Sequence, residues 1–194
     1  MRLEDSLLYL ILDDAVGSAP AAFCEAAIAG GVDVIHLSAG TVLNAEYVAE
    51  IKDVCHANDA LFVVSDNPAL AMEMEADGVH LSSAEESFGQ VRAMVGVDGI
   101  VGISTHNAGD AVLGIGVGAD YLLHWAGRGA PAAFSGLSGA AGCTLFAAGL
   151  SSPDDARAVV EGGVYRLCVE ASLLADGDVT ENAAAFSRLL GRMI

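Results

Sequence analysis

A chain of 194 residues, 54% of them hydrophobic, is long enough for one domain with one substantial core. Eight Lys and Arg residues stand against 26 Asp and Glu residues, and the formal net charge of -18 argues against nucleic acid and anionic lipid as partners. The acidic excess serves solubility or suits a cationic ligand. No apolar run approaches the roughly 20 residues that cross a bilayer, and no signal-peptide pattern is present, so we expect a cytoplasmic protein. Four widely spaced cysteines without zinc-type spacing are expected to be reduced core residues.

In chain order, short apolar runs with strand character alternate with Ala-rich segments that have helical spacing. The predicted strands are 7–12, 32–37, 60–65, 77–81, 99–104, 119–124, 144–149 and 165–170. The predicted helices are 19–29, 44–58, 67–75, 85–94, 107–117, 152–162 and 180–193. This alternation is typical of repeated βα units in a parallel sheet.

Four phrases share one internal pattern, in which a helix closes, Gly or Asp turns the chain and a buried strand begins. They read AIAGGVDVI, MEADGVHL, GVGADYLL and VEGGVYRL. Periodicity alone does not separate a closed barrel from an open doubly wound sheet. Because eight units favour closure, the sequence predicts a single-domain TIM (β/α)₈ barrel over residues 1–194.

The sixth unit is irregular. Residues 127–142, GRGAPAAFSGLSGAAG, are mostly Gly, Ala and Ser where a helix is expected. Loops that follow the strands of a parallel barrel build its site, so this segment is either a mobile lid or a degraded connection with no role.

Chemistry on such a barrel gathers at the carboxyl ends of the strands. The polar and aromatic residues there are Asp13, Asp14, His36, Ser38, Ser65, Asp66, His80, Ser82, Ser104, His106, His124, Trp125 and Glu170. A histidine that ends a buried strand is often a packing residue, yet four of them together predict a polar mouth. They also leave open an enzyme that uses one of them as acid or base on an unphosphorylated substrate.

Carboxylates follow several of these strands and could ring one cavity. Asp66 follows the third strand and Glu85 lies shortly after the fourth, and oxygen ligands of this kind suit Mg²⁺. Some of the acids could instead cap helices. No Walker A loop, GxGxxG or nucleophile elbow is present, which argues against nucleotide hydrolysis and triad chemistry.

Five phrases follow one another along nearly the whole chain: LYLILDD, FVVSDNPALAMEMEADGVHL, VGISTH, GVGADYLL and AAGLSSPDDARAVVEGG. In these phrases and in their order, the chain resembles the thiamine phosphate synthase family. The resemblance implies a small TIM barrel. It also implies the coupling of hydroxymethylpyrimidine pyrophosphate to a thiazole phosphate with Mg²⁺, or, in the thiazole tautomerase branch, the processing of an intermediate.

The resemblance assigns site residues one by one. Asp66 and Glu85 would hold Mg²⁺, and Ser104 and His106 match the family's GxSxH and would orient the substrate. At the places of the family's Gln-x-Arg-x-Lys, which grips pyrophosphate, this chain has His36, Ser38 and Gly40. The remaining substrate-binding residues by resemblance are Ser65, His124, Arg128, Gly149 and Glu170.

Most of the family's phosphate-binding cations are therefore missing. Arg128 is the one cation placed near the mouth, and Glu170 stands where the family has a phosphate-binding Val-Ser pair. A pyrophosphate needs charge compensation. We expect a thiamine-pathway protein that couples or processes pyrimidine and thiazole precursors with altered or lost activity. Its expected catalytic residues are His36, Ser104 and His106. The alternative is a non-catalytic barrel that binds a small neutral or cationic ligand or a protein partner. A homodimer stays open.

Overall fold

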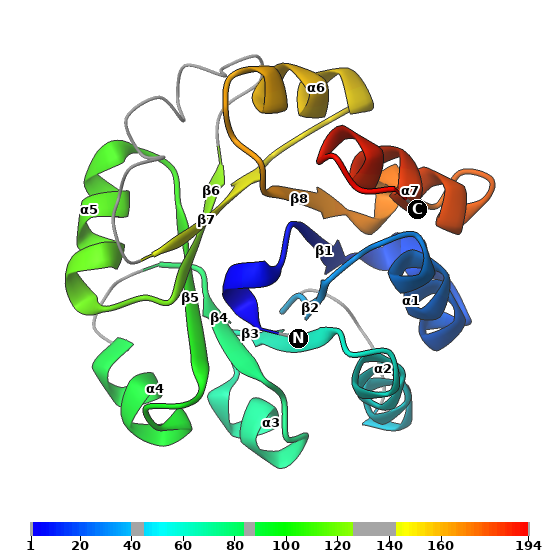
Figure 1. Ribbon diagram of the computed structural model, residues 1–194. Coiled ribbons are helices and arrows are strands. Elements are labelled where there is room, and N and C mark those ends of the chain that lie inside the picture. The colour runs from blue at the N-terminus through cyan, green and yellow to red at the C-terminus, as the bar shows by residue number, and fades with distance from the viewer. Residues whose placement is uncertain (1, 40–44, 84–87, 126–142, 194) are drawn as a thin grey trace.

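The computed structural model describes residues 2–39, 45–83, 88–125 and 143–193. Its strands form one closed parallel barrel in chain order, with the helices arranged around it (Figure 1). The strands are β1 (Leu8–Leu12), β2 (Val34–Leu37), β3 (Leu61–Ser65), β4 (Gly78–Leu81), β5 (Ile100–Thr105), β6 (Tyr121–Trp125), β7 (Thr144–Ala148) and β8 (Leu167–Glu170).

The outer helices are α1 (Pro20–Ala29), α2 (Ala45–Ala57), α3 (Pro68–Glu73), α4 (Phe88–Val95), α5 (Ala108–Val117), α6 (Pro153–Glu161) and α7 (Val179–Leu189). Three short 3₁₀ turns are η1 (Leu3–Asp5), η2 (Asp14–Val16) and η4 (Ala171–Leu173). The predicted TIM barrel is confirmed, as is each predicted strand and helix within a few residues. The irregular segment 127–142, predicted as a lid or a degraded connection, lies outside the described residues.

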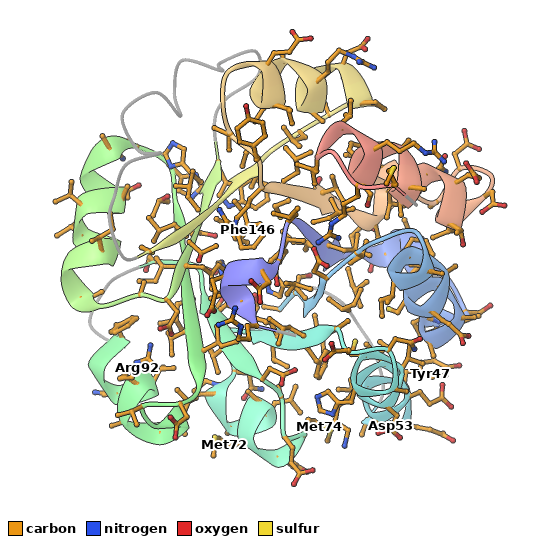
Figure 2. All side chains as sticks on the ribbon, viewed as in Figure 1. Tyr47, Asp53, Met72, Met74, Arg92 and Phe146 are labelled. Atoms are coloured by element: carbon orange, nitrogen blue, oxygen red, sulfur yellow. The ribbon has the colours of Figure 1, made fainter. Side chains whose placement is uncertain are left out.

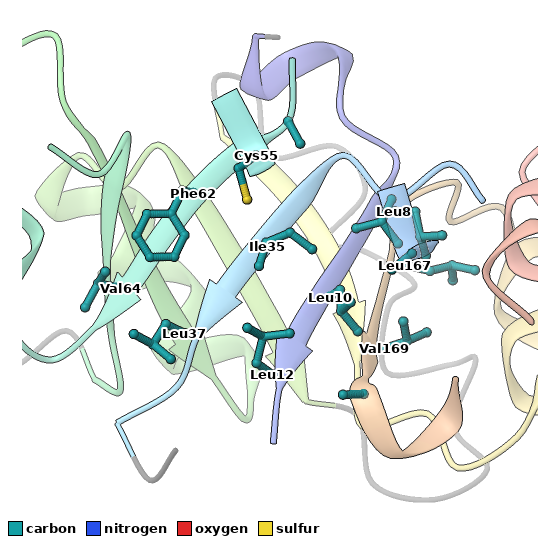
Figure 3. Packing of buried hydrophobic residues seen from close by; sticks show 14 of the residues in the cluster. Leu8, Leu10, Leu12, Ile35, Leu37, Cys55, Phe62, Val64, Leu167 and Val169 are labelled. Carbon is teal, nitrogen blue, oxygen red and sulfur yellow. The ribbon is translucent and has the colours of Figure 1, made fainter. Parts of the chain in front are cut away.

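Alternation along the strands builds two separate cores. Leu8, Leu10 and Leu12 face the helices, and they join the larger apolar cluster that Figure 3 shows from close by. Tyr9 and Ile11, on the opposite face of the same strand, belong to a smaller cluster inside the barrel. Because both faces of a parallel barrel strand are covered, all five residues of β1 are buried and the strand appears as one continuous apolar run.

The barrel interior is unusually aromatic. Tyr9, Tyr121 and Phe146 are each fully buried there, with ring centroids 5.2–6.1 Å apart. Phe146 is labelled among the side chains that fill the ring of strands in Figure 2. Aromatic rings with hydroxyl groups bring polar atoms into this interior, and buried hydroxyls need hydrogen-bond partners.

Side-chain caps begin several helices. Asn67 and Asn107 each accept a hydrogen bond from the backbone N–H three residues later, and Ser152 and Asp178 do the same for α6 and α7. Such caps satisfy backbone donors that the first helical turn leaves unpaired. Because parallel strands all end at the same edge, these capped turns lie beside the carboxyl-terminal mouth of the barrel.

At the opposite end, an aspartate precedes three of the even-numbered strands. Asp33, Asp77 and Asp120 stand directly before β2, β4 and β6. Each carboxylate accepts a backbone N–H at 2.7–2.9 Å from the start of the strand before it. These hydrogen bonds to the aspartate carboxylates fix the register of three strand pairs, and they explain the Asp that recurs in the sequence repeat.

The same aspartates also pair with basic side chains. Arg192 contacts Asp33 at 2.9 Å, Arg92 contacts Asp120 at 2.5 Å, and His56 contacts Asp77 at 3.3 Å. In Figure 2, Arg92 lies beside α4 on the outside of the barrel. At β8, where the repeat has no aspartate, Arg166 donates to the Ser6 and Glu4 carbonyls instead.

The cysteines behave as predicted, since all four are free and Cys24, Cys55 and Cys168 are buried. No helix within the described ranges combines the length and apolarity needed to span a membrane.

Candidate active site

A cavity of about 260 Å³ opens at the carboxyl-terminal ends of the strands, and we call it the mouth cavity. Most of the predicted site residues in the described chain line it. Its described lining is Ile11, Asp13, His36, Ser38, Ala39, Ser65, Asp66, His80, Ser82, Ser104, Leu123, Trp125 and Glu170. The mouth therefore combines hydroxyls, imidazoles, carboxylates and one indole.

His36 stands at the third position of β2 and is almost completely buried. Its Nε2 lies 2.6 Å from Ser65 Oγ, whereas its Nδ1 is buried without a hydrogen-bond partner among the described residues. Burial, and then the neighbouring His80, hold the pKa of His36 well below its ordinary value. The ring is therefore neutral near pH 7 and has one ring nitrogen that the described protein does not satisfy.

His80 connects the mouth to the barrel interior. Its Nε2 lies 2.9 Å from Ser104 Oγ, and its Nδ1 lies 3.1 Å from the Tyr121 hydroxyl. Tyr121 in turn lies 2.9 Å from the Tyr9 hydroxyl, and Trp125 Nε1 donates to Ser104 Oγ at 3.1 Å. Burial lowers the pKa of His80 to about 3, so this ring is also neutral near pH 7.

Three carboxylates share the mouth. Asp13 caps η2 and accepts a second backbone N–H from Ser172, so the helix-capping alternative holds for this acid. Asp66 accepts both the backbone N–H and the hydroxyl of Ser82. Burial, and then Asp13, raise the pKa of Glu170 above its ordinary value. The raised pKa mainly reflects the loss of hydration at Glu170, and the negative charge of Asp13 adds to it.

Asp66 has an unusual backbone. Its φ of 50° lies in the left-handed region, and its N–H donates to the His80 carbonyl at 2.8 Å. A non-glycine residue held there costs on the order of 1–3 kcal/mol, and such strain clusters at functional sites. Here it turns the chain out of β3 and places the Asp66 carboxylate against Ser82.

Only one of the two predicted Mg²⁺ ligands lies in the described part of the chain. Within the described ranges, no three His, Cys, Asp or Glu side chains gather closely enough to hold a metal ion. Asp66 lines the mouth, but Glu85 lies outside the described residues. The described residues alone do not make a Mg²⁺ site.

His106 lies at a second cavity of about 250 Å³, which shares Ser82 and Ser104 with the mouth cavity. Its ring stacks on Trp125 with centroids 6.5 Å apart. The His106 backbone N–H donates to Asp110 at 2.9 Å, which fixes the turn after β5. Of the pair predicted to orient substrate, Ser104 therefore lines both cavities, whereas His106 lines only the second one.

The basic side chains lie elsewhere. Of the eight in the chain, Arg128 falls outside the described residues and none of the other seven appears in the described lining of the mouth. Arg92, Arg166 and Arg192 serve the amino-terminal end of the barrel, and Arg2, Lys52 and Arg188 pair with acidic neighbours on the surface.

Two predicted binding residues do not appear in the described lining of either cavity. His124 is buried, and its Nδ1 lies 2.9 Å from Thr105 Oγ1. It alternates with Leu123 and Trp125, which line the mouth, so its side chain leaves the strand on the opposite face. Gly149 follows β7 with a φ of 77°. Their assignment to substrate stays a prediction.

Two residues of the site were not predicted. Tyr9 and Tyr121 lie beneath the mouth and carry the hydrogen bonds that reach Ser104 through His80. The sequence held a signal for them, because each is a tyrosine inside a run of aliphatic residues. A buried phenol requires a partner, but the sequence does not show that the two phenols meet.

Comparison with known proteins shows the family to which the chain belongs. Residues 8–127 match the family described as thiamine monophosphate synthase. A thiamine-phosphate synthase of Alcanivorax borkumensis is 32% identical over 94% of this chain and 91% of its own length. The chain belongs to the thiamine monophosphate synthase family. A thiamine-phosphate synthase of Chlorobium phaeobacteroides is 28% identical over 92% of this chain and 87% of its own length.

The barrel also matches a solved structure of similar fold. The thiamine phosphate pyrophosphorylase of Pyrococcus furiosus superposes with a TM-score of 0.80, covers 95% of both chains and is 23% identical. At that identity the superposition supports the fold alone. The family resemblance seen in the sequence is thus confirmed, and the differences in the mouth are differences within one family.

Proposed function

We propose that this protein acts in thiamine biosynthesis and takes a pyrimidine or thiazole precursor into the mouth cavity, with an activity altered from the coupling that releases pyrophosphate. The observation that carries the proposal is the charge of the mouth. Asp13, Asp66 and Glu170 line it, and none of the seven described basic side chains does. The family membership supports a role in thiamine biosynthesis. The negative charge of the mouth cavity supports an activity that differs from the coupling reaction.

The electrostatic cost of a phosphate in this mouth is large. A like charge about 4 Å away costs on the order of 4 kcal/mol at an effective dielectric near 20. His36 and His80 do not offset it, because both are neutral near pH 7. Arg128, outside the described residues, is the one cation left to compensate a phosphate group.

The side chains of the mouth cavity suit an unphosphorylated ring better than a phosphate group. Ser38, Ser65, Ser82 and Ser104 place hydroxyls around the mouth, and Trp125 offers an aromatic face. His36 also lines the mouth, and its Nδ1 is buried without a hydrogen-bond partner among the described residues, so tautomerisation or general acid–base work on a bound ring would require this nitrogen to become accessible from the cavity.

Binding measurements test the proposal directly. Trp125 is the single tryptophan of the chain and lines the mouth, so its fluorescence reports occupancy. We expect the unphosphorylated thiazole and hydroxymethylpyrimidine to bind more tightly than thiazole phosphate and hydroxymethylpyrimidine pyrophosphate, by calorimetry and by fluorescence. Tighter binding of the pyrophosphate, with formation of thiamine phosphate, would restore the ordinary synthase reaction.

The Mg²⁺ assignment has its own test. If Asp66 and Glu85 hold the ion, the double variant Asp66→Ala/Glu85→Ala loses the rise in melting temperature that Mg²⁺ produces in the wild type. Asp98→Ala, at an exposed acid with no place in the mouth, is the matched control. A metal effect that persists in the double variant would refute the assignment.

A second candidate is a non-catalytic barrel that binds a small neutral or cationic ligand. The uncompensated carboxylates of the mouth favour it, since they attract positive charge. The two candidates separate when the precursors are incubated with the protein and analysed by mass spectrometry. Binding with no new product supports the binding barrel, whereas conversion of either precursor supports the enzyme.

A further inference from the structure

We propose that Tyr9, Tyr121 and His80 form a hydrogen-bond chain with one direction, and that this chain fixes the Ser104 hydroxyl as a donor toward the ligand. Tyr9, Tyr121 and His80 would be positioning residues, since they act through Ser104. The inference rests on the proposed function only in taking the mouth cavity as the binding site.

The chain crosses the barrel from β1 to β5. Its consecutive links are 2.9 Å between the Tyr9 and Tyr121 hydroxyls, 3.1 Å from Tyr121 to His80 Nδ1, and 2.9 Å from His80 Nε2 to Ser104 Oγ. Tyr9 and Tyr121 are fully buried and His80 is 2% exposed. Bulk water does not replace these bonds, so the protons must be arranged within the chain itself.

The inner end decides the direction, and the mouth end fixes one acceptor role of Ser104. At the mouth end, the indole N–H of Trp125 can only donate, so Ser104 Oγ accepts there. At the inner end, the Tyr9 hydroxyl has Tyr121 as its one hydrogen-bond partner among the described residues. A buried hydroxyl proton left without an acceptor is costly, whereas an unused lone pair on the same oxygen costs less. Tyr9 therefore donates to Tyr121.

The positions of the remaining protons follow from the donation by Tyr9. Tyr121 accepts from Tyr9 and donates to His80 Nδ1. His80 is neutral and carries one ring proton, which must then be on Nε2, and it donates to Ser104 Oγ. Ser104 Oγ now accepts from both His80 and Trp125, so its two lone pairs are occupied. Its own proton has no acceptor among the described protein atoms and points to a ligand.

Gly102 makes the chain possible. A Cβ built on Gly102 of β5 would lie 2.0 Å from the Tyr121 ring, so only glycine leaves room for that ring to pass over β5 inside the barrel. The close approach brings the Tyr121 hydroxyl within reach of both Tyr9 and His80. The GIS of the family phrase thus combines the space for the chain with Ser104 at its end.

The inference restricts the ligand. A group bound at Ser104 must present a hydrogen-bond acceptor, such as an unprotonated ring nitrogen or a carbonyl oxygen. A ligand that offers only N–H groups there would meet a second donor, which costs the desolvation of both. A hydrogen-bond donor on the ligand is matched instead by Asp66 or Glu170 across the mouth.

The decisive measurement is the tautomer of His80 in the ligand-free protein. Two-bond ¹H–¹⁵N NMR spectra at pH 7, assigned with a His80→Asn variant and by contacts to the Tyr121 ring, distinguish a proton on Nε2 from one on Nδ1. We expect the proton on Nε2. Tyr121→Phe removes the donor to Nδ1 and mixes the tautomers, whereas Tyr9→Phe retains Nε2–H. A wild-type proton on Nδ1 would overturn the direction of the chain.

A binding measurement then tests the consequence at Ser104, with the unphosphorylated thiazole and hydroxymethylpyrimidine as probes. For whichever probe the wild type binds, we expect Ser104→Ala to weaken affinity about 10-fold and Tyr121→Phe about 3-fold, while Tyr165→Phe, at an exposed tyrosine before β8, changes nothing. Equal affinity of Ser104→Ala and wild type would refute the donor role. Failure of the wild type to bind either probe contradicts the proposed function, and the His80 tautomer still decides the hydrogen-bond chain.

Discussion

At the amino-terminal end of the barrel, buried or half-buried aspartates pair with basic side chains, whereas at the carboxyl-terminal end three carboxylates share a mouth without a described cation. The paired aspartates are Asp33, Asp77 and Asp120, and the mouth carboxylates are Asp13, Asp66 and Glu170. A chain with eight basic residues has few to place, and most of those described support structure. The acids at one end therefore hold strands together. Those at the other end line the mouth cavity, where Asp13 and Asp66 also accept hydrogen bonds from neighbouring turns.

The difference shows in the chemistry of single residues. Asp33 has a 4% exposed side chain and satisfies two backbone N–H groups together with Arg192. Glu170 has no such partner in the described part of the chain, and burial raises its pKa. Residues of one charge type thus have opposite effects on stability, depending on which end of the strands they occupy.

The largest expected effect is at Asp33. Asp33→Ala should lower the free energy of unfolding by about 3–5 kcal/mol, because it leaves Arg192 and two backbone donors without their acceptor. Urea denaturation at pH 7 measures this loss. Asp98→Ala, at an exposed acid, should stay within about 0.5 kcal/mol of wild type. Equal losses in the two variants would remove the distinction between paired and unpaired acids.

Glycine substitution tests the aromatic layer between the two ends. Gly102→Ala should cost about 1–3 kcal/mol, because the new methyl group overlaps the Tyr121 ring. Gly116→Ala, in the exposed part of α5 with open space around it, should instead add about 0.5–1 kcal/mol through helix propensity. Thermal unfolding of both variants provides the comparison, and a stable Gly102→Ala would contradict the close packing.

Acidification tests the neutral histidines of the mouth. The pKa of His80 is about 3 in the fold and near 6.5 when unfolded, so the unfolded chain takes up the proton first. The stability is complete above about pH 6.5 and falls by about 1.4 kcal/mol per pH unit for this one residue as the pH drops toward 3. His80→Asn should flatten the fall, as measured by urea midpoints from pH 7 to pH 5. An unchanged slope would mean that His80 is not held neutral.

The smallest effect is expected at Glu170. Because its pKa is raised, the unfolded state ionises more readily, and the destabilisation appears as the pH rises above about 4.5. Glu170→Gln should therefore be slightly more stable than wild type at pH 7, by less than about 1 kcal/mol after solvent screening, and equal to it at pH 4. A loss of stability at pH 7 would show that the carboxylate has a partner.

The sequence predicted the barrel well because its signals are local. Each helix end, glycine turn and buried strand can be recognised within about ten residues, and eight such units leave closure as the natural solution. It also predicted which side chains lie at the mouth, since every strand ends at the same edge. Side-chain direction was harder, and His124 shows why: one step along a strand moves a side chain to the other face.

The sequence by itself determined the fold, the family and the shortage of cations, because these depend on composition and on the order of local patterns. Only the tertiary structure decided where the few cations go and which buried polar atoms meet. Tyr9 and Tyr121 are 112 residues apart, and their hydroxyls lie 2.9 Å from each other because barrel closure and Gly102 bring them together. Hydrogen bonds across a barrel depend on ångström distances between distant strands, which no local pattern encodes.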